Sequence, residues 1–125
     1  MKQHNKNQLV RTGEIEWKSL TSIDEGDVSG IYVKSLMFDD ETRRSPTILL
    51  KFDAGASYPL HTHPGGEEVF VLEGDIHLGK DHLHAGDYLF TAPDNLHAAR
   101  TDGGCILFLK APRATEFVKK SIKGE

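Results

Sequence analysis

The sequence has little of three features that would assign its class at once: cysteine, long apolar runs and excess positive charge. A single cysteine, Cys105, excludes an internal disulfide and favours a reducing compartment. No apolar run approaches the roughly 18 residues of a membrane span, and the polar N-terminus does not resemble a secretory signal. The formal net charge of −4 gives no basic field for nucleic acid. We therefore expect a cytoplasmic protein that binds neither membranes nor nucleic acid.

The length is that of a single domain. A chain of 125 residues buries about two-thirds of its unfolded surface, enough for one hydrophobic core. Residues 1–10 are almost entirely polar, so we expect a flexible N-terminal tail. Residues 11–125 contain no repeat or linker and are predicted to form one folded domain.

Most of this domain has the pattern of short β-strands. Segments rich in β-branched and aromatic residues alternate with turn signals containing Gly, Pro, Asn or Asp, at intervals of roughly 8–12 residues. Such spacing predicts an all-β sandwich or barrel. The expected strands are 31–38, 47–53, 67–73, 75–79, 87–91, 96–101 and 105–110.

Two of these strands and the C-terminal segment have further patterns. Segments 69–72 and 106–109 are apolar at every position, so we expect both faces to be covered, by a second sheet or a second subunit. In segment 114–123, Phe117, Val118 and Ile122 fall on one side of a helix, with lysines toward its end. This pattern predicts a short C-terminal helix.

Ionisable residues stand directly before one of the apolar strands. Side chains alternate along a strand, so His61 and His63 point to the same face, about 6–7 Å apart at their Cα atoms. Pro64-Gly65-Gly66 permits a tight reversal, after which Glu67 and Glu68 occupy opposite faces of the next strand. We expect Glu67 to join the histidines and assign no role to Glu68.

The remaining histidines are interpreted as ordinary polar residues. His82 and His84 have the same spacing as the pair above, but neither a glycine turn nor a glutamate follows them. A solvated hairpin is the favoured interpretation. His77 is expected to be an ordinary strand residue, and His4 belongs to the predicted tail.

The complete frame around the first pair resembles the first conserved motif of the cupin superfamily. Gly55, His61, His63, Glu67 and Gly74 match that motif at every fixed position and spacing. Five fixed residues rarely fall at such intervals by accident, so the resemblance is specific.

A second cupin motif follows in altered form. Gly86 and His97 keep the separation typical of the family, but the turn at Pro93 is displaced by one residue. Asn95 stands where the family has glycine, and asparagine tolerates a left-handed backbone. Thr101 replaces the final asparagine. The two motifs cover residues 55–101.

The resemblance implies a fold and a metal site. The wider pattern is most similar to the cupin domain of zinc-binding anti-sigma factors and to small dioxygenases acting on acetylacetone or dihydroxyacetophenone. It implies a double-stranded β-helix, a jelly-roll-like barrel, that functions as a homodimer. It also implies one divalent transition metal, such as Fe, Zn, Mn, Ni or Cu, bound by His61, His63, Glu67 and His97.

Aromatic residues of the predicted strands are candidates for the wall of a pocket above the metal, although core packing is the favoured interpretation of each. Arg100 is a candidate anion contact near its mouth, and Cys105 is expected to be buried and inert. An apolar pocket suits a small carbonyl, enol or catechol-like molecule. No acid–base dyad or nucleophile is recognisable. The aromatic candidates are Phe52, Tyr58, Phe70, Tyr88, Phe90 and Phe108.

Three functions remain open. The first is a metal-dependent dioxygenase acting on a small diketone or aromatic ketone, since four protein ligands on an octahedral metal leave two positions for substrate and O₂. The second is a metal-occupied sensor or ligand-binding module; the anti-sigma relatives carry a sigma-binding segment for which this sequence has no room, so a sensor would act through a partner. The third is a non-redox isomerase or lyase.

Overall fold

The computed structural model describes residues 6–20 and 28–117, and these residues are predominantly β-strand. One 3-10 turn, Thr12–Glu14, precedes the strands. No helical segment within the described residues has the length and apolarity of a membrane span. The strands are β1 (Lys18–Ser19), β2 (Ile31–Asp39), β3 (Arg44–Phe52), β4 (Ser57–Thr62), β5 (Glu67–Leu78), β6 (Asp81–His84), β7 (Tyr88–Thr91), β8 (Leu96–Arg100), β9 (Cys105–Lys110) and β10 (Glu116–Phe117).

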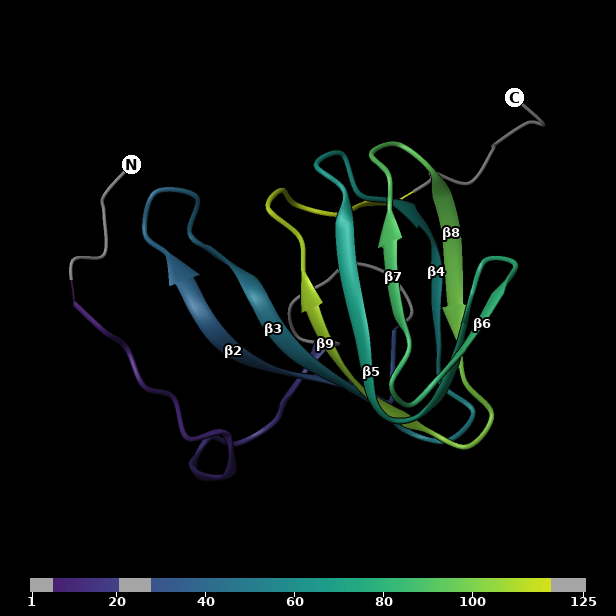
Figure 1. The fold of residues 1–125 in the computed structure, drawn as a ribbon, viewed down its shortest axis with the longest axis horizontal. Helices are drawn as coiled ribbons and strands as arrows, with labels where there is room; N and C mark the ends of the chain where they lie inside the picture. The colour runs from purple at the N-terminus through teal and green to yellow at the C-terminus, as the bar shows by residue number, and fades with distance from the viewer. Residues whose placement is uncertain (1–5, 21–27, 118–125) are drawn as a thin grey trace.

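These strands form one sheet that curls into a barrel, as the predicted all-β fold requires. The strand order is β1-β2-β3-β9-β5-β8-β4-β10, and β6 and β7 also pair with β5. Every pairing in the described residues is antiparallel. Figure 1 shows the curl, with β2, β3 and β9 on one side and β8, β4 and β6 on the other. The expected double-stranded β-helix is therefore confirmed.

Strand β5 joins the two halves of the barrel. Its first part pairs with β7 and β9, whereas its last four residues pair with β6 and β8. The prediction of two strands, 67–73 and 75–79, separated by a turn was wrong. A β-bulge between Val71 and Glu73 and a positive φ of 76° at Gly74 bend the strand without ending it, because a bulge increases local twist while pairing continues.

The core lies inside the barrel and follows from strand alternation. Along the first part of β5, Val69 and Val71 are buried with Glu67, and after the bulge Ile76 and Leu78 take over the inward positions. Leu107 of β9 packs in the same core cluster. The barrel interior is therefore apolar on both sides of the bend.

Among residues 6–20 and 28–117, the apolar strands β5 and β9 are covered on one face only. Phe70 and Leu72 point outward and are 39% and 46% exposed. Phe108 lies directly opposite Phe70 and is half-buried. The prediction that both faces would be covered is therefore not met by the described residues of a single chain.

The C-terminal segment adds a strand where a helix was expected. Glu116 and Phe117 pair with Thr62 and His61 of β4, and the Phe117 ring packs against Tyr58 at 5.4 Å. The predicted helix over 114–123 is therefore wrong for these residues, because pairing with an open strand edge prevails over a local helical pattern. Positions 118–123 of that prediction lie outside the described residues.

The bend in β5 provides a test of the fold. A Cβ atom at Gly74 would lie 2.2 Å from the carbonyl oxygen of Gly104 and 3.0 Å from the Cα of Cys105. We predict that Gly74→Ala lowers the free energy of unfolding by about 3 kcal/mol, because left-handed strain adds to a backbone contact that only movement can relieve. Urea unfolding would measure the loss.

Gly86→Ala is the matched control. Gly86 also has a positive φ, of 93°, but a Cβ there would meet no atom within 4 Å. Only the left-handed strain applies, and we expect a loss of about 1 kcal/mol. Equal losses in the two variants would contradict the role assigned to the close approach at Gly74.

Candidate metal centre

The structure brings together the four residues that the cupin motifs indicated. His61 lies on β4, His63 just beyond its end, Glu67 at the start of β5 and His97 on β8. His61 and His97 are direct partners across β4 and β8. All four side chains are buried, with exposed fractions of 2%, 3%, 3% and 7%. We call them the inner cluster.

A tight turn returns the chain from the histidines to Glu67, as predicted. The amide of Gly66 donates a hydrogen bond of 2.9 Å to the carbonyl oxygen of His63. Gly66 has a φ of 86°, which favours glycine. Glu67 then faces inward, whereas Glu68 faces the outer surface and accepts a 2.9 Å hydrogen bond from the Tyr88 hydroxyl.

Distances within the inner cluster are those of groups that converge on one point. The carboxylate of Glu67 lies 3.0 Å from His63 Nε2 and 3.5 Å from His97 Nε2. The ring of His61 lies 4.8 Å from that of His63 and 4.6 Å from that of His97, centroid to centroid. One ligand atom from each of the three histidines lies within 4.8 Å of the other two.

Hydrogen bonds on the far side of two rings orient them toward this point. His61 Nδ1 lies 2.6 Å from the carbonyl oxygen of Pro59, which can only accept, so the proton of this ring is on Nδ1 and Nε2 keeps its lone pair. His63 Nδ1 lies 3.3 Å from the hydroxyl of Thr115. The ring orientations therefore depend on partners outside the inner cluster.

Unpaired buried atoms show that the inner cluster fits a metal ion. Among the described residues, four buried side-chain polar atoms have no hydrogen-bond partner, and three of them are His63 Nε2, Glu67 Oε1 and His97 Nε2. A buried polar atom without a partner is destabilising by about 1–3 kcal/mol. Three imidazoles and a carboxylate are a common ligand set for a divalent transition metal, and an ion between them would satisfy all three atoms.

Burial keeps two of the histidines, His61 and His97, in the neutral form that binds a metal. Desolvation lowers the pKa of His61 to about 4, although the hydrogen bond to Pro59 opposes this effect. Desolvation also lowers the pKa of His97, against the attraction of the Glu67 carboxylate. Both rings are therefore already neutral near pH 7. They would not have to release a proton in order to bind a metal at that pH.

A cavity of about 760 Å³ opens above the inner cluster. Its lining is largely apolar and includes Val69, Ile76, Leu107 and Leu109. Charged lining residues come from the N-terminal segment and from the β2–β3 region. This volume lies in the range of small-molecule sites in proteins.

The pocket aromatics were only partly predicted. Phe52 and Tyr58 line the cavity. Phe70, Tyr88 and Phe90 are exposed on the outer surface. Phe108 lies between the buried residues Leu107 and Leu109, so its side chain points to the outer surface as well. Alternation divides each strand into two faces but does not say which one is inside. Because the outer face of β5, β7 and β9 is also apolar, the sequence did not distinguish it from the inner face.

Two residues that line the cavity were not predicted as part of the site. Phe117 lies 6.3 Å from the His61 ring, and Thr115 contacts His63 through the hydrogen bond above. Both come from the C-terminal segment, where the sequence suggested a helix. A two-residue strand has no periodicity, so no local signal was available to find them.

Arg100 and Cys105 lie away from the inner cluster. Arg100 is exposed and donates a 3.3 Å hydrogen bond to Asp102, and it does not line the cavity. The expected anion contact is therefore not supported. Cys105 is buried, and desolvation raises the pKa of its thiol to about 12, as an inert core cysteine requires.

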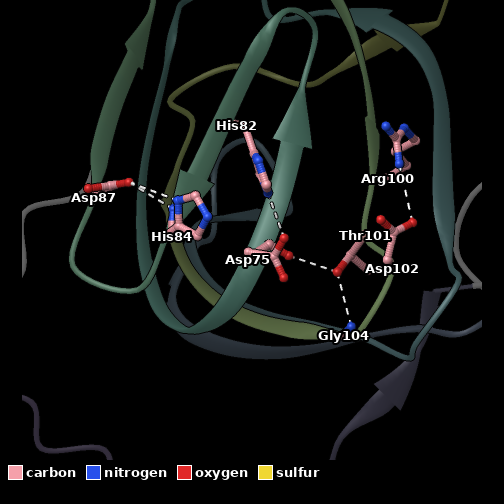
Figure 2. Close-up of polar contacts among 8 residues, drawn as sticks. All are labelled: Asp75, His82, His84, Asp87, Arg100, Thr101, Asp102 and Gly104. Carbon is pink, nitrogen blue, oxygen red and sulfur yellow. Dashed lines mark hydrogen bonds and ion pairs between the residues drawn. The ribbon is translucent and has the colours of Figure 1, made fainter.

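In the altered second motif, the left-handed turn residue differs from the predicted one, and Thr101 makes hydrogen bonds at the motif's last position. The positive φ in its turn belongs to Asp94, at 67°, and not to Asn95 as predicted. Thr101 is buried, donates a 2.7 Å hydrogen bond to the carbonyl oxygen of Asp75 and accepts one of 3.0 Å from the amide of Gly104. Figure 2 shows these bonds at the end of β8.

Comparison with solved structures shows the same fold in proteins of several activities. A putative acetylacetone dioxygenase from Methylibium petroleiphilum superposes with a TM-score of 0.77 at 23% identity, covering 95% of this chain and 85% of that one. The acetylacetone dioxygenase of Acinetobacter johnsonii gives a TM-score of 0.75 at 19% identity, covering 96% and 83%.

A regulatory protein has the same fold. A chain of the complex between Rhodobacter sphaeroides SigE and the anti-sigma ChrR gives a TM-score of 0.61 at 23% identity, covering 81% of this chain and 50% of that one. No curated protein sequence matches the chain. A family model described as the ChrR cupin-like domain matches residues 5–114. Since this match spans most of the sequence, the chain belongs to the family of ChrR cupin-like domains, within the cupin superfamily.

Proposed function

We propose that the inner cluster binds one divalent transition metal through His61, His63, Glu67 and His97, and that the chain is a metal-dependent dioxygenase for a small diketone or aromatic ketone. The observation that carries the proposal is the set of unpaired atoms on His63, Glu67 and His97 at the base of an apolar cavity. The fold shared with an acetylacetone dioxygenase and with a protein described as a putative acetylacetone dioxygenase supports the substrate class.

The side chains of the cavity have separate tasks in such a reaction. A bound redox-active metal would supply Lewis acidity toward a substrate oxygen and electron transfer to O₂. The Glu67 carboxylate would offset part of the charge of a bound metal, while Tyr58 and Phe117 pack near the His61 ring and hold it in place. The aliphatic lining excludes water from the substrate, which strengthens electrostatic interactions at the base of the cavity.

The ligand set is tested by two matched double variants. We predict that protein isolated after gel filtration carries close to one metal ion per chain and that His61→Ala with His63→Ala removes it, because two of four donors are lost. His82→Ala with His84→Ala, which removes two exposed imidazoles of the same spacing, should leave this tightly held ion in place. Elemental analysis measures both. Metal retained by the first variant at the level of the wild type would refute the site.

The reaction is tested by oxygen consumption. We predict that protein loaded with Fe(II) under anaerobic conditions consumes O₂ when given acetylacetone or a dihydroxyacetophenone, and that His61→Ala with His63→Ala consumes none above background. An oxygen electrode records the rate, and product analysis confirms cleavage. No uptake with either compound, in protein that demonstrably holds iron, would contradict the dioxygenase while leaving the metal site intact.

A sensor is the second candidate, because the matching family is that of ChrR cupin-like domains. One of the similar structures is the complex of ChrR with SigE, and the match covers half the length of the chain found in that complex. A sensor would use the same metal and cavity to bind a small molecule without turnover. Tightly held metal together with ligand-induced stabilisation and no O₂ uptake would favour this candidate.

We also propose that the chain forms a homodimer through the outer face of β5, β7 and β9. This face exposes Phe70, Leu72, Tyr88 and Phe90 side by side, and contiguous exposed apolar residues commonly mark an interface. Glu68 and Lys110, of opposite charge, are direct partners in the same surface. The charges of this pair cancel, so they would not repel the same face of a second copy.

The dimer is tested by placing a charge in this face. We predict that Phe70→Lys shifts the protein from dimer to monomer, because a buried unpaired lysine is strongly disfavoured at an interface. Leu96→Lys is the control, since Leu96 is also exposed but lies on β8. Light scattering coupled to size-exclusion chromatography gives the mass. A wild-type monomer, or a dimer unaffected by Phe70→Lys, would refute this interface.

A further inference from the structure

Four side chains that can bind a transition metal lie together on the hairpin of β5 and β6. In the register of this hairpin, Asp75 is opposite His84 and His77 is opposite His82. The residues that lie between them on the two strands, Ile76 and Leu83, are buried in the core. The four side chains therefore project from one outer surface, as two pairs spaced by the two-residue period of a strand. We call them the outer cluster.

Three members of the outer cluster approach one another closely. Asp75, His77 and His82 each offer a ligand atom within 4.8 Å of the others. His82 Nε2 lies 2.6 Å from Asp75 Oδ2, and the His82 ring stacks on the His77 ring at a centroid distance of 3.8 Å and an angle of 14°. The His84 ring is 4.3 Å from that of His82. Figure 2 shows His82 directed at Asp75.

We propose that Asp75, His77 and His82 form a second binding site for a divalent transition metal such as Zn²⁺, with His84 as an adjacent fourth donor. Imidazole and carboxylate are the ligands that Zn²⁺ takes from histidine and aspartate, and donor atoms around a tetrahedral Zn²⁺ lie about 3.3 Å apart. In the outer cluster the Asp75–His82 pair is closer than this, at 2.6 Å, and all three donor atoms lie within 4.8 Å of one another, so rotation of the side chains would bring them to that spacing. His82 and Asp75 are 42% and 30% exposed at their side chains, which leaves them room to move.

The arrangement contains more than a hydrogen-bonded pair requires. Asp75 and His82 alone account for the 2.6 Å contact. His77 and His84 add two further imidazoles to the same surface through the strand register, without a hydrogen bond to that carboxylate among the described contacts. Three imidazoles and one carboxylate are also the composition of the inner cluster. The chain thus presents the same set of donors twice, once inside the barrel and once on its outer surface.

Neighbouring charges make the outer site the weaker of the two. Arg100 lies opposite His77 on β8, and its positive charge opposes a cation, although its guanidinium is engaged by Asp102. Asp87 lies 4.0 Å from His84 Nδ1 and adds a negative charge beside the site. Water competes for an exposed ion, and the Asp75–His82 hydrogen bond must be given up. We therefore expect the inner cluster to fill first.

Zn²⁺ titration of metal-free, tag-free protein tests the proposal. Isothermal calorimetry of the full chain should show a weaker class of site in addition to any tight one. His77→Ala with His82→Ala should reduce the total stoichiometry by one ion per chain, whereas His61→Ala with His63→Ala should retain the weaker class. Asp75→Asn keeps the shape of the side chain and should weaken that class at least tenfold.

Asp81→Asn is the matched control, because it makes the same charge change on the same hairpin but at a position that is not part of the outer cluster. Its titration should equal that of the wild type. Thermal unfolding without metal should show that each variant is folded. A stoichiometry for His77→Ala with His82→Ala equal to that of the wild type would overturn the proposal, as would equal effects of Asp75→Asn and Asp81→Asn. These outcomes do not depend on the metal or the activity of the inner cluster.

Discussion

The burial of three imidazoles and one carboxylate inside an apolar barrel is the constraint on which the rest of the structure depends. Such groups are expensive to remove from water unless each finds a partner. Here the backbone carbonyl of Pro59 accepts a hydrogen bond from Nδ1 of His61. Buried atoms of His63, Glu67 and His97, by contrast, make no hydrogen bond within the part of the chain that the structure describes. The protein therefore holds an arrangement that is unfavourable by itself and that a cation would stabilise.

Strand β5 supplies the geometry for this arrangement. It begins with Glu67 inside the barrel, bends at the bulge before Gly74 and ends with Asp75 and His77 outside. Without the bulge, strict alternation along twelve residues would keep odd-numbered positions on the inner face throughout. The single extra residue exchanges the faces. Odd-numbered positions therefore give a buried carboxylate, Glu67, at one end of β5 and the outward-facing donors Asp75 and His77 at the other.

The site was more predictable from the sequence than the fold around it. Strand alternation and a glycine turn, which are local constraints, brought His61, His63 and Glu67 together in advance. His97, on the distant strand β8, was added only by the resemblance to the second cupin motif. The bend of β5, the outward direction of Phe70 and the pairing of Phe117 depend on contacts between distant segments. The left-handed residue of the second turn was displaced from Asn95 to Asp94 for a similar reason, since both residue types tolerate that conformation.

Strand β10 has a consequence for how forces reach the centre of the molecule. The two residues of this strand pair with β4 at His61 and Thr62, and Thr115 just before it contacts His63. The C-terminal segment is thus fastened to the same backbone that carries two histidines of the inner cluster. A displacement of this segment would therefore reach the backbone of His61 through strand pairing and the ring of His63 through Thr115. The position of the C-terminal segment and the geometry of the inner cluster are therefore linked.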